Sequence, residues 1–123
     1  MQIFHGSVAH RVLLYGYSNA RAKSMKSVLL DKKQFDQLMD TNSIADILSL
    51  LDKTPYKEDI VATGLKFSGI KQLEFALGKN YARAAKKILK IAPPEAKQTL
   101  LAILNRQDVH NLKTILLAKH LKQ

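Results

Sequence analysis

Apolar residues recur along this chain at steps of three and four, the spacing that places side chains on one face of an α-helix. The first such face runs through Val8, Val12 and Tyr15 and continues to Met25 and Leu29. It predicts one long amphipathic helix over roughly residues 7–30. Gly16 lies inside this helix, where it costs about 1 kcal/mol relative to alanine.

Two short helices are predicted next. Asp31 is a favourable N-cap for the first of them, and either Asn42 or Ser43 can cap the second. The inward positions expected in the first are Phe35, Leu38 and Met39. The inward positions expected in the second are Ile44, Ile47, Leu48 and Leu51. Thr54-Pro55-Tyr56 then predicts a loop over residues 53–59, because the residue before a proline is pushed out of helical geometry.

The second half of the chain carries a pronounced amphipathic pattern. A short helix is expected from Asp59 to Phe67, with Gly69 ending it. A helix over residues 73–91 has a continuous apolar stripe, and basic residues recur on its other side. The stripe consists of Leu73, Leu77, Tyr81, Ala84, Ile88 and Ile91.

Two more helices are predicted after Pro93-Pro94, where Pro94 suits a first helical turn. Asn105-Arg106-Gln107 predicts a tight connection between them, with Asp108 as the N-cap of the last helix. That last helix is expected to bury Leu112, Ile115 and Leu116. No alternating strand pattern occurs. The sequence therefore predicts an all-α fold, a compact bundle of five to six helices with no sheet.

Length and composition narrow the class of protein. The chain has 123 residues, which suits a single helical domain over residues 1–123. Cysteine is absent, so disulfides and thiolate metal sites are excluded. No stretch approaches the roughly 20 apolar residues of a membrane-spanning helix. The N-terminal segment does not have the pattern of a signal peptide.

The net charge of +10 is unevenly distributed. Residues 1–30 carry +4, residues 31–59 carry −3 and residues 60–123 carry +9. This asymmetry suggests an anionic partner, although lysine-rich solvated faces are common in small proteins. The candidate partner-binding residues lie on the predicted helix 73–91, and they are Lys79, Arg83, Lys86, Lys87 and Lys90. They could face an acidic protein surface or anionic lipid headgroups.

Motifs for catalysis and cofactor binding are not found. Gly78-Lys79 lacks the preceding glycine and the following hydroxyl residue of a phosphate-binding loop. Ser7 lacks the flanking pattern of a nucleophile elbow. The histidines show no metal-ligand spacing; they are His5, His10, His110 and His120. We therefore expect no catalytic residue, no metal site and no cofactor.

Two segments contain polar residues in patterns that helix packing alone does not require, and these segments resemble a known family. Near the N-terminus the motif is Tyr17-Ser18-Asn19-Ala20-Arg21-Ala22-Lys23, followed by Leu29-Leu30. Near the C-terminus it comprises Arg106, Asp108, Val109, Asn111, Leu112, Lys113, Ile115 and Leu116. Thr54-Pro55-Tyr56 and Leu73-Glu74 fit between them in order. The chain resembles the C subunit of archaeal and bacterial V-type ATPases, the relative of the eukaryotic d subunit.

This resemblance implies a non-catalytic rotor component. Members of the family are about three times longer and contain three similar helical domains, of which this chain resembles the first. The family's funnel sits on the membrane ring of proteolipid subunits and receives the foot of the central shaft. The partners implied are thus shaft and ring subunits, with peripheral location at the cytoplasmic face of the membrane. The chain could be an excised domain, a split gene product or a shortened relative.

Two other functions stay open from the residues alone. The +9 charge of residues 60–123 and the turn predicted at 105–107 would also suit a small helix-turn-helix nucleic-acid-binding domain. Against it, Lys113 is the only basic residue in the first two turns of its second helix. The other alternative is a small helical enzyme without a recognised motif, which would need a deep pocket with titratable groups.

Overall fold

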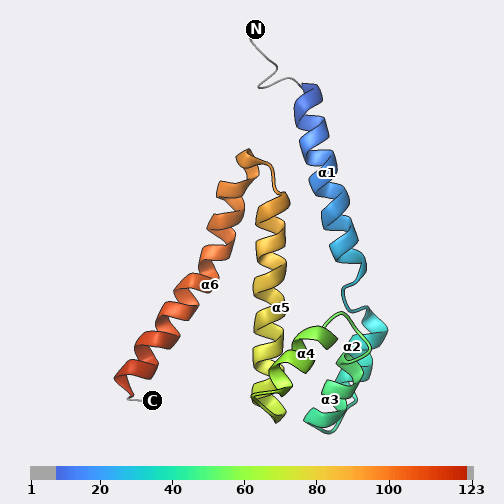
Figure 1. Ribbon diagram of the computed structural model, residues 1–123, viewed down its shortest axis with the longest axis vertical. Helices are drawn as coiled ribbons and strands as arrows, with labels where there is room; N and C mark the ends of the chain where they lie inside the picture. Colours follow the sequence, from blue (N-terminus) through green and yellow to red (C-terminus); the bar gives the residue numbers. More distant parts are fainter. Residues whose placement is uncertain (1–7, 122–123) are drawn as a thin grey trace. The chain divides into compact units, whose positions relative to one another are not determined.

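The computed structural model describes residues 8–121 and contains six α-helices and no strand within that range. The helices are α1 (Val8–Ser27), α2 (Lys32–Met39), α3 (Ile44–Leu51), α4 (Lys57–Gly64), α5 (Gly69–Ile91) and α6 (Pro94–His120) (Figure 1). The predicted all-α class is confirmed. His5 and Ser7 lie outside the described residues.

The chain divides into two units. One comprises residues 19–86, and the other comprises residues up to 18 together with residues from 87 onward. Helices α1 and α5 each contribute to both units, while α2, α3 and α4 belong to the first and α6 to the second. No helix of the described chain is both long and apolar enough to span a bilayer.

The caps predicted for the short helices are confirmed. The Asp31 carboxylate accepts a hydrogen bond from the Gln34 backbone N–H at 2.7 Å. The Gln34 side-chain oxygen accepts in return from the Asp31 backbone N–H at 2.9 Å, which completes a capping box. Ser43, rather than Asn42, caps α3 by accepting from the Asp46 backbone N–H. These bonds satisfy N–H groups that a helix N-terminus leaves without partners.

The core lies in the unit of residues 19–86. Leu51 from α3, Ile60 from α4 and Ala76 from α5 are its buried apolar side chains. Half-buried apolar residues pack around them, namely Leu30, Leu38, Ile47, Leu48, Tyr56 and Leu73. The inward orientation predicted for Leu38, Ile47, Leu48 and Leu51 therefore holds.

Several helix boundaries differ from the prediction. Helix α1 ends at Ser27, whose hydroxyl donates to the Ser24 carbonyl at 2.7 Å and thereby competes with continued helix. Helix α4 begins two residues earlier than expected. Helix α5 begins at Gly69, which has a φ of 63° and so reverses the chain direction in a conformation that glycine adopts at low cost.

The turn predicted at Asn105-Arg106-Gln107 is wrong, because α6 is continuous from Pro94 to His120. Asp108 lies inside this helix and does not cap one. The Gln107 amide donates to the Asn111 side-chain oxygen at 3.1 Å, one turn further along the same helix. No glycine or proline follows Pro94 in α6, so nothing in the backbone ends the helix there. The turn that the helix-turn-helix alternative requires is therefore absent from α6.

The inward orientation predicted for many apolar residues is also wrong. Val8, Val12, Tyr15 and Leu29 are exposed, as are Phe35 and Met39 of α2. Leu77, Tyr81 and Ile88 of the α5 stripe are partly exposed, and so are Leu112, Ile115 and Leu116 of α6. The spacing correctly identified helical faces, but these side chains keep between 36% and 83% of their surface exposed.

Candidate functional site

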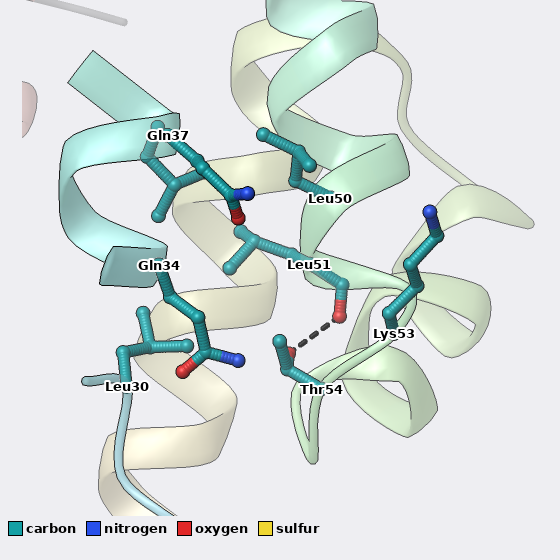
Figure 2. A pocket seen from close by; sticks show the side chains of 8 residues that line it. Leu30, Gln34, Gln37, Leu50, Leu51, Lys53 and Thr54 are labelled. Carbon is teal, nitrogen blue, oxygen red and sulfur yellow. Dashed lines mark hydrogen bonds between the residues drawn. The ribbon is translucent and has the colours of Figure 1, made fainter. Parts of the chain in front are cut away.

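A hollow of about 290 Å³ opens in the unit of residues 19–86, between α2 and the end of α3 (Figure 2). Its apolar side consists of Leu30, Leu38, Leu50 and Leu51, and its polar side of Gln34, Gln37, Lys53 and Thr54. The Thr54 hydroxyl donates to the Leu51 carbonyl at 2.5 Å, which holds the turn after α3. The hollow thus forms where two short helices meet a fixed turn.

The polar groups of this hollow are two amides, the Thr54 hydroxyl and the Lys53 ammonium. In Figure 2, Gln34 and Gln37 extend from α2 toward Leu51 and Thr54, whereas Lys53 points away from them. The Gln34 oxygen is already used in the capping box of α2. Amides above a leucine surface can hold a neutral polar or peptide group, but they supply neither a nucleophile nor a general base.

A buried ion-pair cluster joins α4 to α5. Asp59 is only 5% exposed, and one of its carboxylate oxygens accepts from Arg83 Nη2 at 2.7 Å and from Asn80 Nδ2 at 3.1 Å. Arg83 Nη1 lies 2.9 Å from Glu58 Oε2 at the surface. A buried carboxylate needs such compensation because removal from water strongly disfavours an isolated charge. The cluster is a structural clamp between the two helices.

A second polar contact reinforces the same pair of helices. The buried Thr63 hydroxyl lies 2.7 Å from the Asp59 carbonyl and 3.3 Å from the Gln72 carbonyl. The Gln72 side-chain amide donates to the Ile60 carbonyl at 3.0 Å. Gly64 permits this approach, because a Cβ atom there would lie 2.7 Å from Gln72 Nε2.

The candidate basic residues of α5 separate into two groups. Lys79, Lys86, Lys87 and Lys90 are exposed. Arg83 is instead held by Asp59 and Glu58, so its guanidinium is committed within the chain. Sequence reasoning placed all five on one basic surface because it had no means of pairing Arg83 with Asp59 and Glu58, which are 24 and 25 residues away.

The motif residues of the resemblance lie mostly at the surface. Tyr17, Asn19 and Arg21 are exposed on α1, while Tyr56 is half-buried against the core. The C-terminal motif is on α6, where Arg106, Asp108, Asn111 and Lys113 are all exposed. Neither motif therefore forms a buried chemical site within its own helix.

The other unit has two polar contacts and a smaller hollow of its own. The Arg11 guanidinium lies 3.6 Å from the Glu95 carboxylate at the start of α6. The Ser18 hydroxyl donates to the Ile91 carbonyl at the end of α5. A hollow of about 150 Å³ lies between His10, Arg11, Leu14 and Tyr15 of α1 and Pro93, Pro94 and Glu95. These contacts hold the start of α1 to the α5–α6 connection.

Metal-ligand side chains do not gather in the described part of the chain. Between residues 8 and 121, no three histidine or acidic side chains come together as a set that could hold a metal ion.

Comparison with known proteins identifies the family. The family model described as ATP synthase (C/AC39) subunit matches residues 18–123. The C subunit of the A-type ATP synthase of Methanosarcina mazei is 33% identical over 105 residues, and that of Methanosarcina acetivorans is 34% identical over 105 residues. In both, the match covers 85% of this chain. The C subunit of the V-type ATP synthase of Deinococcus radiodurans is 29% identical over 101 residues, 82% of this chain.

The matched region is 29% of the length of each of these three relatives. No solved structure gives a significant match. The family match covers more than half of the chain and includes α2 to α6, with both residues of the ion pair between Asp59 and Arg83. The resemblance seen in the sequence motifs is confirmed: this chain belongs to the ATP synthase (C/AC39) subunit family.

Proposed function

We propose that this chain is a non-catalytic central-stalk component of a rotary A/V-type ATPase. In this role it links the central shaft to the proteolipid ring in the membrane and turns with both. The rotation couples ion transport to ATP hydrolysis or to ATP synthesis. The observation that carries the proposal is the family match over residues 18–123. The site geometry is compatible with it, because amides, lysines and a structural ion pair suit docking rather than bond-breaking chemistry.

The exposed apolar faces support a role in an assembly. Val8, Val12 and Leu13 of α1 lie at the surface of the described chain. Large apolar areas at a protein surface typically mark interaction sites. We propose shaft and ring subunits as the partners, with the chain peripheral at the cytoplasmic face of the membrane.

The exposed lysines of α5 are proposed as electrostatic contacts for the same partners. Lys79, Lys86, Lys87 and Lys90 would face acidic groups of a partner protein or anionic lipid headgroups. Charges at an interface mainly accelerate association and select the partner. Arg83 lies on the same helix, but it serves the clamp to α4.

A capture experiment tests the proposal. The tagged full chain is incubated with solubilised membranes of its source at moderate salt, and bound proteins are identified by mass spectrometry. We expect shaft or proteolipid-ring subunits. The variant Lys86→Glu/Lys90→Glu should lose most of this capture. Lys66→Glu/Lys71→Glu is the matched control, because both of those lysines are exposed outside the proposed surface.

Two outcomes would contradict the proposal. Capture of nucleic acid that is lost by roughly 200 mM salt would favour the nucleic-acid-binding alternative, since phosphate contacts release counterions. Capture of neither rotor subunits nor nucleic acid would contradict docking by this chain on its own.

A further inference from the structure

One face of α6 carries large apolar side chains that no part of the described chain covers. Leu112 and Ile115 are 60% and 59% exposed, and Val109 and Leu116 are similarly exposed. Steps of three and four place all four on one side of the helix. Helix α6 is continuous through this region (Figure 1), so no turn interrupts this face.

The same face extends as a heptad seam. Alternating steps of four and three lead through Leu101, Asn105, Asp108, Leu112, Ile115 and Lys119. This average spacing of 3.5 residues is the one by which two helices pack along each other. Polar residues within such a seam commonly fix the register and the number of helices. The seam of α6 therefore has the pattern of a helix-pairing surface with a specified register.

The charges of this seam are arranged symmetrically. Asp108 lies four residues before Leu112, and Lys119 lies four residues after Ile115. Both side chains are exposed, and neither forms an ion pair between residues 8 and 121. An apolar pair is thus bracketed by one acid and one base at equal spacing.

We propose that α6 pairs antiparallel with α6 of a second copy of this chain. In this arrangement Leu112 of each copy lies opposite Ile115 of the other, and Asp108 of each lies opposite Lys119 of the other. A two-fold interface requires this reciprocity, in which the same two positions meet twice. The apolar layers supply the stabilisation, and the two ion pairs at their ends set the register.

The order of the two charges along the seam favours an antiparallel arrangement, with a second copy of this chain as the partner. In a parallel in-register pair, Asp108 would face Asp108 and Lys119 would face Lys119, which are repulsive contacts. In the antiparallel pair both contacts become attractive, so this seam is complementary to itself. The pairing does not depend on the proposed function, because it concerns the chain alone.

Sedimentation equilibrium of the purified full chain tests the pairing. We expect a dimer for the natural chain and a monomer for Asp108→Lys, which places two lysines against each other at both ends. The charge swap Asp108→Lys/Lys119→Asp should restore the dimer, because it inverts both pairs without removing them. Asp40→Lys is the control for the same change in net charge, since Asp40 is exposed outside α6, and it should stay dimeric.

The results that would overturn the proposal are equally specific. A monomeric natural chain at every accessible concentration, or a trimer, excludes the two-fold pair. A dimer that survives Asp108→Lys, or a charge swap that stays monomeric, excludes the proposed register. Circular dichroism shows whether each variant is still helical. If Asp108→Lys unfolds, disulfide cross-linking of Leu112→Cys with Ile115→Cys tests the same pairing without changing a charge.

A cysteine experiment tests the direction of pairing. The chain has no cysteine of its own, so Leu112→Cys and Ile115→Cys each introduce a single thiol. The antiparallel pair predicts a mixed disulfide between the two variants when they are combined and oxidised, with little homodimer of either alone. Predominant disulfide dimers within each variant separately would indicate parallel pairing and overturn the proposal. Lys113→Cys, which lies off the seam, is the control and should cross-link little.

Discussion

The unit of residues 19–86 and helix α6 both carry apolar residues at helical spacing, but only the former buries a group of them. In the unit, short helices and tight turns bring Leu51, Ile60 and Ala76 into contact. In α6, 27 residues run without a turn, and Leu112 and Ile115 stay exposed. The spacing of apolar residues specifies which face of a helix must pack against a partner. Turns in the chain decide whether another helix of the same chain can be that partner.

Polar contacts differ between the two regions in the same way. Asp59, Asn80 and Arg83 connect α4 with α5, so their hydrogen bonds fix how two elements pack. The side-chain bond from Gln107 to Asn111 connects one turn of α6 with the next and positions no other element. The first region is therefore stabilised by tertiary contacts and the second mainly by its own helical hydrogen bonds.

The largest expected effect comes from the core of the first region. Leu51→Ala removes most of a side chain that is 3% exposed and should lower the free energy of unfolding by about 3–4 kcal/mol, through lost burial and a cavity. The matched change Leu117→Ala in α6 should cost no more than about 0.5 kcal/mol, because that leucine is already exposed. Urea unfolding followed by circular dichroism measures both, and equal losses would refute the contrast.

The next effect tests the continuity of α6. Gln107→Pro should cost the helix about 3 kcal/mol, because proline removes a backbone donor and clashes with the preceding turn. We expect a clear loss of ellipticity at 222 nm, while Gln107→Ala should retain it. An unchanged spectrum for the proline variant would instead indicate a turn at residues 105–107.

Removing the buried charge of the α4–α5 clamp should have a smaller effect. Asp59→Asn leaves Arg83 without its buried partner and should lower the free energy of unfolding by about 2 kcal/mol. This is below the full cost of breaking a buried pair because the Arg83 side chain is 36% exposed. Glu58→Gln at the solvent end of the cluster is the control and should cost about 0.5 kcal/mol or less. If both variants lose the same stability, Asp59 is not the essential partner.

The smallest effect concerns the cap of α2. Asp31→Ala removes the carboxylate that accepts from the Gln34 backbone and should cost about 1 kcal/mol in urea unfolding. Asp40→Ala at the other end of α2 provides the comparison, because Asp40 makes its C-cap hydrogen bonds through its backbone N–H. Helix macrodipole effects favour removal of a negative charge there. A greater loss for Asp40→Ala would contradict the assigned capping role.

Local signals allowed much of the fold to be predicted from the sequence. The cap at Asp31 and the position of Pro94 act over three or four residues, so residue type and spacing were sufficient to predict them. For α3 they narrowed the cap to Asn42 or Ser43, and the structure shows Ser43. The same reasoning failed at Asp108, because a residue suited to an N-cap can also lie within a helix. The residues around it contain no glycine or proline to end α6.

Long-range contacts could not be predicted in this way. Asp59 and Arg83 are 24 residues apart, and each has an ordinary interpretation by itself, as an acid beside a turn and as part of a basic face. A possible signal was the placement of Asn80 one turn before Arg83, which presents two donors on one face of α5. The family motifs were recognised from sequence, although most of their residues prove to be exposed rather than assembled into one site.

Hydrogen exchange tests most directly the claim that α6 needs a partner helix whereas residues 19–86 form the self-supporting core. The full chain would be measured in dilute solution, where the α6 pair dissociates, and at a high concentration, where the pair forms. We predict slow exchange around Ile60 and Ala76 in both states, and fast exchange over residues 109–117 that slows at the high concentration. Protected α6 amides in the dilute chain, or no change at the high concentration, would contradict this claim.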